Sequence, residues 1–134
     1  MIPNADITIY NKYIDAATRS DKYQRVEVMR VVWQSTKAIS RAKEMTAANV
    51  ALILIPFERG KNYLAPKAWQ ASKTNHWTLQ EGDIVVRGVA SDEITSSFTL
   101  TDLRATYEDV VTITSVDVMD QGSANVRHFE VNCK

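Results

Sequence analysis

The chain has 134 residues, of which 45% are hydrophobic and 24% are charged, with only 4 Gly and 3 Pro. This size and composition predict one domain, residues 1–134, and exclude collagen-like, low-complexity and wholly disordered proteins. The 16 Lys and Arg balance 16 Asp and Glu, so the net charge indicates no nucleic-acid, membrane or acidic partner. The single cysteine, Cys133, excludes a disulfide framework and a Cys-rich metal site within one chain.

The first third of the chain is typical of two strands. Residues 7–10 (ITIY) predict a short strand, and the polar residues 11–21 are typical of a loop or hairpin connection. Residues 23–33 are rich in β-branched and aromatic side chains and predict a long strand. Its apolar residues change parity, so we expect this strand to bend or to change its buried face midway. Residues 36–45 have helical spacing but weak caps, and their structure stays open.

The middle of the chain combines a buried strand with a long irregular segment. Residues 50–55 predict a strand that ends at Pro56, and the apolar run 50–57 is far shorter than the roughly 20 residues that span a bilayer. Residues 57–76 have no convincing period, so we predict a long loop that protrudes from the barrel. Such loops are uncommon in compact domains and are usually functional. We therefore expect a partner contact here.

The last third alternates turns and strands around one short helix. A turn at residues 81–83 precedes a strand at 84–87, and a strand at 110–118 is followed by a turn at 120–123 and a strand at 125–132. Residues 99–107 predict a helix, with Thr101 as its cap and Asp102 at the positive end of the helix dipole. Five or six strands with one or two short helices predict a mainly β fold, a small antiparallel β-barrel with a long loop.

The residues capable of chemistry are scattered. His76 and His128 are isolated, and Cys133 lies five residues after His128, on the opposite face of a strand. The acidic pairs at residues 92–93 and 108–109 are adjacent in sequence, which places them poorly to share a proton. We therefore expect no catalytic residues, no metal and no cofactor, and a protein that is not an enzyme.

The balanced charge is unevenly distributed along the chain. Residues 1–74 hold 12 Lys and Arg against 6 Asp and Glu, whereas residues 75–134 hold 4 against 10. A basic face of one copy could meet an acidic face of the next, and a contact of that kind generates rings or filaments. Alternatively, the two halves interleave in one sheet and the charges mix. The sequence leaves both arrangements open.

The protruding loop combines cations with aromatic residues. Its cations are Arg59, Lys61, Lys67 and Lys73, and its aromatic residues with the following tryptophan are Tyr63, Trp69 and Trp77. This combination occurs in proteins that follow a phosphate backbone, although four lysines and arginines on a loop also fit a solvated surface. The aromatic residues are candidate anchors that hold the loop on the barrel.

Five stretches of the sequence together resemble a known class of proteins. They are ITIYNKY (7–13), YQRVEVMRVVW (23–33), ALILIPF (51–57), WTLQEGDIVVRG (77–88) and DLRATYEDVVTITSVDVMDQGSANVRHFEV (102–131). In this order, and over nearly the full length, the chain resembles head-tail connector proteins of tailed bacteriophages. The resemblance is to the head-completion or stopper type of phages and prophages of Gram-positive bacteria.

This resemblance implies a virion protein made in the host cytoplasm. Its copies would form a homo-oligomeric ring between the portal or adaptor proteins and the tail proteins, where the ring retains the packaged DNA and docks the tail. By position, the loop that projects into the DNA channel of such rings corresponds to residues 59–76. Arg59, Lys61, Lys67 and Lys73 would then face phosphates of the genome.

Two other interpretations stay open. The first is another neck or tail-joining protein, either a tail terminator or an adaptor, although adaptors are typically helical. The second is a nucleic-acid-binding module with a small barrel fold, which would bind short DNA as a monomer.

Overall fold

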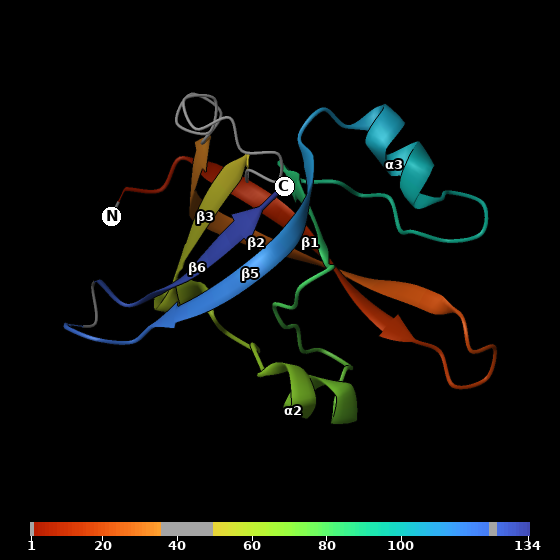
Figure 1. The fold of residues 1–134 in the computed structure, drawn as a ribbon, viewed down its shortest axis with the longest axis horizontal. Helices are drawn as coiled ribbons and strands as arrows, with labels where there is room; N and C mark the ends of the chain where they lie inside the picture. Colours follow the sequence, from red (N-terminus) through yellow and green to blue (C-terminus); the bar gives the residue numbers. More distant parts are fainter. Residues whose placement is uncertain (1, 36–49, 124–125) are drawn as a thin grey trace.

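The computed structural model describes residues 2–35, 50–123 and 126–134. Within these residues, antiparallel strands close into a small barrel in the order β1-β2-β3-β6-β5-β4 (Figure 1). The predicted mainly β fold, a small antiparallel barrel, is confirmed. The strands are β1 (Ala5–Ile14), β2 (Asp21–Ser35), β3 (Ala51–Pro56), β4 (Ile84–Arg87), β5 (Val110–Met119) and β6 (His128–Cys133). The helical segments are η1 (Phe57–Arg59), α2 (Pro66–Ala71) and α3 (Leu100–Thr106).

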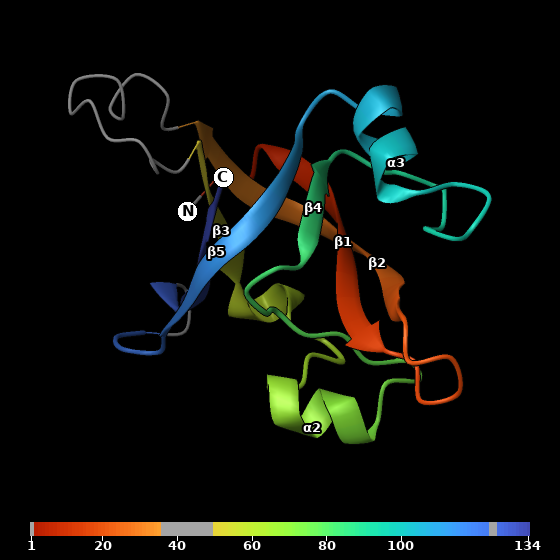
Figure 2. The ribbon, with the colours of Figure 1, turned by 45° about the vertical axis from the view of Figure 1, so that its right-hand side comes forward.

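The pair β1 and β2 forms the longest hairpin. The polar stretch 11–21 contains its turn, but β1 continues to Ile14, past the predicted end at Tyr10. The hairpin therefore extends from the barrel as an arm, drawn in red and orange (Figures 1 and 2).

A β-bulge lies near the end of β2. Ile7 pairs with Val28 but Ala5 pairs with Val31, so β2 has one extra residue, and Arg30 adopts a φ of 60° there. The extra residue shifts the buried positions from Val28 to Val31. The predicted change of buried face is confirmed.

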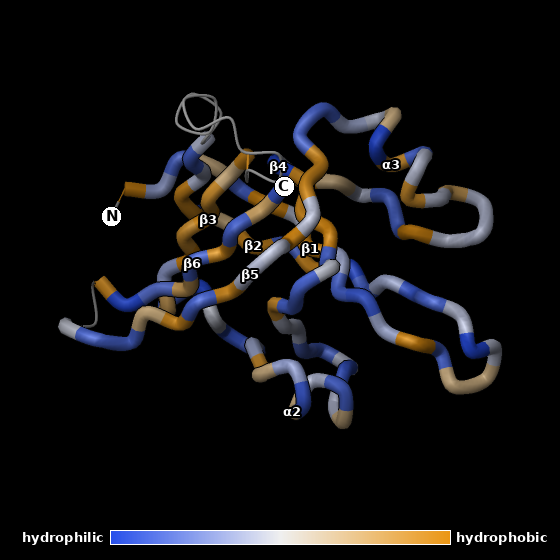
Figure 3. Tube along the Cα trace, in the orientation of Figure 1, coloured by the Kyte–Doolittle hydropathy of each residue, from blue (hydrophilic) through white to orange (hydrophobic). Residues whose placement is uncertain are grey.

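The core lies inside the barrel. Apolar side chains of β1, β3 and β6 point inward, among them the fully buried Ile7, Ile53 and Ile55. A second cluster lies on the outer face of β1 and β4, where α3 covers Tyr10 and Val86 with Leu103. Figure 3 shows that apolar residues gather on the barrel strands, whereas the segment around α2 is mostly hydrophilic.

The cap of α3 differs from the prediction. The helix begins after Thr99, whose Oγ1 accepts a hydrogen bond from the Asp102 N–H at 3.3 Å, while Asp102 Oδ2 accepts one from the Thr99 N–H at 2.9 Å. This is a capping box, which requires an acidic or amide residue three positions after the cap. Only Thr99 meets that spacing with Asp102, so the prediction of Thr101 was wrong.

Two predicted boundaries fall outside the described residues. Residues 36–45 lie there, and so does Asn125, the predicted first residue of the last strand. The turn at Gly82 is where the sequence predicted it, and its φ of 92° favours glycine.

The topology separates the two halves of the chain. β1, β2 and β3 are contiguous in the barrel wall, and β4, β5 and β6 form the rest of it. The strands of the basic and acidic halves therefore do not interleave. The strands themselves hold little of the opposite charge, since β1–β3 carry four Lys and Arg against three Asp and Glu, and β4–β6 carry one against two.

Candidate functional site

The segment that follows β3 folds back beneath the barrel. It contains η1 and the helix α2, which starts at Pro66, where the fixed φ of proline suits a first helical position. A helix of six residues is too short to show a period, so the sequence predicted only a loop. The rest of residues 57–76 is irregular.

The three aromatic residues predicted as anchors are packed. Trp69 has an exposed fraction of 0%, lies edge-on to Tyr13 at 6.2 Å between ring centroids, and donates from Nε1 to the His76 carbonyl at 3.2 Å. Trp77 Nε1 donates to the Lys61 carbonyl at 2.8 Å, and its ring meets Tyr63 at 5.2 Å. These contacts join both ends of the segment and fix it to the β1–β2 arm.

The structure does not bring the four predicted cations together. Lys73 Nζ donates to the Gln70 carbonyl at 3.0 Å and lies over the rings of Tyr13 and Trp69. Lys67 is exposed on α2, and Arg59 and Lys61 lie at the other side of the segment. Arg59 forms an ion pair with Glu58 at 3.7 Å.

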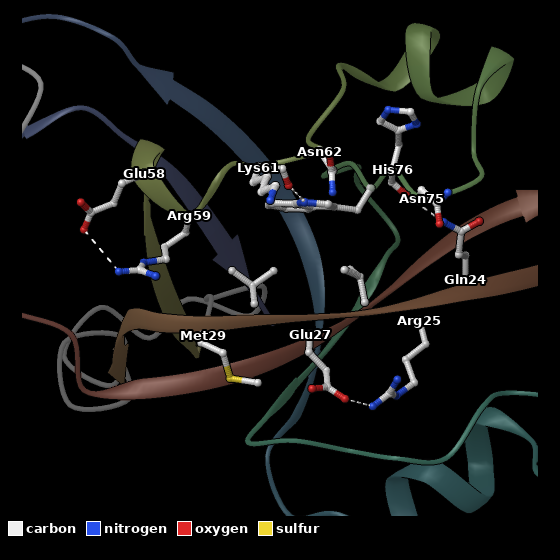
Figure 4. A pocket seen from close by; sticks show the side chains of 13 residues that line it. Gln24, Arg25, Glu27, Met29, Glu58, Arg59, Lys61, Asn62, Asn75 and His76 are labelled. Carbon is white, nitrogen blue, oxygen red and sulfur yellow. Dashed lines mark hydrogen bonds and ion pairs between the residues drawn. The ribbon is translucent and has the colours of Figure 1, made fainter.

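Arg59 and Lys61 border a groove of about 720 Å³ between β2 and the segment (Figure 4). Residues 24–29 form one wall, and the other wall consists of Glu58, Arg59, Lys61, Asn62 and residues 75–77. Figure 4 shows Gln24 on one side of the β2 ribbon and Glu27 and Met29 on the other. Since side chains of both faces line the groove, it runs along the edge of β2.

The groove is lined by polar side chains, and some of its charged side chains neutralise one another. Arg25 pairs with Glu27 at its rim, and the Gln24 amide donates to the carbonyls of Lys73 and His76, which closes one end. Among the described residues, Lys61 has no ion pair, and the buried Nδ1 of His76 and Nε of Arg59 have no hydrogen-bond partner. Such a groove offers hydrogen bonds and positive charge along a strand.

Sequence reasoning missed a buried carboxylate, Asp83. Its Oδ1 accepts from the Lys12 N–H at 2.9 Å and its Oδ2 accepts from the Asn11 amide at 2.8 Å, while Gln80 donates to both oxygens. Burial raises the pKa of Asp83 to about 6. In the sequence Asp83 follows Gly82 and is typical of a solvated turn, so no local signal marks it as buried. Because all of these donors are neutral, the role of Asp83 is structural: it links β1 to the turn that precedes β4.

The remaining candidate residues, His128 and Cys133, are not paired with each other. His128 Nε2 contacts Glu130 Oε2 at 3.0 Å, whereas Cys133 is buried in the core, where burial raises its thiol pKa to about 12. Within residues 2–35, 50–123 and 126–134, no cluster of His, Cys, Asp or Glu has a metal-binding arrangement. In the same residues, no helix has the length and apolar character needed to cross a membrane.

Comparison with proteins of curated function and with solved structures finds no match. A protein-family model does match: it is described as a family of unknown function, DUF6751, and it covers residues 2–134. Because this match spans nearly the whole chain, the protein belongs to the DUF6751 family.

Proposed function

We propose that this protein is a structural subunit of a bacteriophage neck, without enzymatic activity. Its copies form a homo-oligomeric ring that connects the portal or adaptor to the tail and helps to retain the packaged DNA. The similarity of its sequence pattern to head-tail connectors suggests this role. The observation that carries the proposal is the position of the exposed apolar side chains.

Large apolar side chains are exposed on the two arms of the barrel. Ile14 on the β1–β2 arm is 68% exposed. On the β5–β6 arm, which consists of residues 115–119 and 126–130, Val118 and Val126 are 53% and 50% exposed, whereas Ile2 and Val89, at 87% and 51%, lie outside both arms. The two arms extend toward opposite sides of the molecule (Figure 1). Exposed apolar residues that gather on one arm, as Val118, Met119 and Val126 do, are typical of surfaces that an assembly buries, and contacts on two sides suit a ring.

The distribution of charge along the chain favours contacts between surfaces of opposite charge. Most of the unlike charge lies outside the strands, because residues 57–76 hold four Lys and Arg against one Asp or Glu, whereas residues 88–109 hold one against five. Copies arranged head to tail would place the basic region of one copy beside the acidic region of the next. This arrangement favours a heterologous interface that weakens as salt is added.

The proposed DNA contact falls on two of the four predicted cations. Among the described residues Lys61 and Lys67 are exposed and have no ion pair, whereas Lys73 is held by Gln70 and Arg59 by Glu58. In a ring Lys67 repeats once per copy, so its phosphate contacts add up over the assembly, and Lys61 adds to them only where the interface between copies leaves it free.

Native mass spectrometry at several protein concentrations, at low and at high salt, tests the assembly. We expect monomers or weak association at high salt, and larger oligomers at low salt and high concentration. A stable closed dimer under both conditions would contradict ring assembly. Localisation of the protein between head and tail in purified phage particles by electron microscopy tests the neck role itself.

A small-barrel nucleic-acid-binding module is the second candidate. The exposed Lys61 beside the groove favours it. This function predicts salt-dependent binding of short DNA by the free monomer, measured by fluorescence anisotropy. Lys61→Ala should weaken this binding, whereas Lys22→Ala, on the β1–β2 arm, should not. A tail terminator would assemble without this binding, and the strand-rich fold speaks against an adaptor.

A further inference from the structure

One edge of β2 has no strand beside it. β2 pairs with β1 through residues 21–31, but on its other side it pairs with β3 only through residues 32–35. The groove lies along the unpaired part, at residues 24–29. An unpaired strand edge is a template for another strand.

The register shows which backbone groups face the groove. The Lys12 N–H donates to Asp83 and is therefore turned away from β2, and Lys12 lies opposite Tyr23. Because residues of an antiparallel pair alternate in direction, the N–H and C=O groups of Tyr23, Arg25 and Glu27 point away from β1. Among the described residues, no backbone hydrogen bond from elsewhere reaches these groups.

β5 has a second open edge. It pairs with β4 only through residues 110–112, whereas its pairing with β6 continues to Met119. On the side of β4, residues 115–119 therefore lie beside no described strand. This edge carries the exposed Asp117, Val118 and Met119, and Asp120 follows it.

The two open edges lie on opposite sides of the barrel. In the strand order, two strands separate β2 from β5 in each direction. β2 belongs to the basic half of the chain and β5 to the acidic half. A contact between them cannot form within one copy, and it joins copies head to tail.

We propose that the open edge of β2 in one copy pairs with the open edge of β5 in a second copy, so that the β5–β6 arm lies in the groove. This inference rests on the proposed function and specifies the interface of its ring. Lys61 at the groove would face the acidic end of the arm, at Asp117 and Asp120, and Met29 would cover Val118. Strand addition of this kind takes its affinity from backbone hydrogen bonds and its selectivity from side chains.

Cysteine cross-linking tests the pairing directly. The exposed edge residues are replaced in separate proteins, Glu27→Cys and Val118→Cys, and treated with a short bis-maleimide. Native Cys133 is buried, so the unmodified chain is the background control. We expect a cross-linked dimer only when the two variants are mixed, and a ladder of multimers from the double variant.

Charge reversal tests the direction of the contact. Lys61→Glu and Asp117→Lys should each weaken association by about two- to fivefold, the scale of one surface ion pair, and the double variant should recover most of the loss. Lys67→Glu on α2 and Glu93→Lys are the matched controls, since both are exposed and neither lies at the proposed edges. Equal weakening by the controls would contradict the pairing.

The outcomes separate this interface from the neck role. Cross-links of Glu27→Cys only to itself indicate a two-fold interface, and links only to another virion protein indicate a different occupant; either result overturns the pairing but leaves assembly intact. The absence of a 27–118 link in concentrated or assembled protein also overturns it. A 27–118 link in a protein that is absent from phage particles supports the interface and refutes the neck role.

Discussion

The Asn11 side chain donates from Nδ2 to Asp83 Oδ2 at 2.8 Å, and both residues are fully buried. The same amide group donates to the Thr78 carbonyl at 2.7 Å and accepts from the Thr78 N–H at 3.1 Å. One side chain of β1 thus holds two positions of the segment between α2 and β4. That segment carries Trp77 to the end of the barrel, where it forms part of the groove.

Replacement of Asn11 should destabilise the whole protein. Asn11→Ala leaves the buried N–H and C=O of Thr78 without their partner and removes one of the donors to Asp83 Oδ2, which keeps those of Gln80. Each unsatisfied buried group costs about 1–3 kcal/mol. We expect a loss of about 3 kcal/mol in the free energy of unfolding, measured by urea denaturation. Asn132→Ala, at a half-buried position with one side-chain hydrogen bond to Ser115, should cost less than about 1 kcal/mol; similar losses in both variants would contradict the role of Asn11.

The free energy of unfolding should depend on pH because Asp83 titrates at different pH values in the folded and the unfolded chain. Its pKa is about 6 in the folded protein and about 3.9 in an unfolded chain. The folded state therefore binds more protons between these values, and its stability falls as the pH rises from about 4 to 6 and is constant above. The expected loss is about 2–3 kcal/mol.

Comparison with Asp83→Asn isolates this contribution. The variant cannot titrate at residue 83, so the difference in unfolding free energy between the native chain and the variant should fall over the same interval. Thermal or urea unfolding at several pH values measures both curves. A difference that rises with pH would show that the hydrogen bonds from Asn11, Lys12 and Gln80 outweigh burial.

Trp69 should hold α2 in place. Trp69→Ala removes a fully buried ring that packs on Tyr13, and such truncations cost about 3–5 kcal/mol. We expect accelerated amide hydrogen exchange throughout residues 62–77 and a smaller effect on β3 and β6. Trp69→Phe, which keeps an aromatic ring of smaller size but loses the hydrogen bond to the His76 carbonyl, is the intermediate control.

The assigned cap of α3 can be tested by comparing substitutions of two threonines, Thr99 and Thr101. Thr99→Ala should cost about 1 kcal/mol because it removes the capping box, whereas Thr101→Ala, exposed in the first turn, should change stability by less than about 0.5 kcal/mol. Urea denaturation of both variants measures the difference. A larger loss at Thr101 would contradict the assigned helix start.

Local pattern was sufficient to predict most strands. The β-branched residues of β2 and the change in their parity indicate the strand and its bulge, because one face must stay buried on both sides of the extra residue. The same pattern hid the extension of β1, since Asn11 and Lys12 are polar. Asn11 is buried only because its partners, Thr78 and Asp83, lie 67 and 72 residues away.

The candidate site was less accessible to sequence reasoning. The loop cations were found, but their separation depends on α2, a helix of six residues, which turns Lys73 back toward Trp69. The groove itself arises from unpaired backbone along β2. Pairing is a property of the register between strands, and no residue of 24–29 reveals it alone.

Because the Cys133 thiol is buried, its chemical modification can report when the barrel opens in the native chain. This thiol lies in the core on β6, between β3 and β5, and it is the one cysteine of the sequence. A small alkylating reagent can reach it only when these strands part, so the rate of modification under native conditions follows the fluctuations of that side of the barrel. Assembly that covers or braces these strands would slow the reaction, even in a mixture too heterogeneous for structure determination.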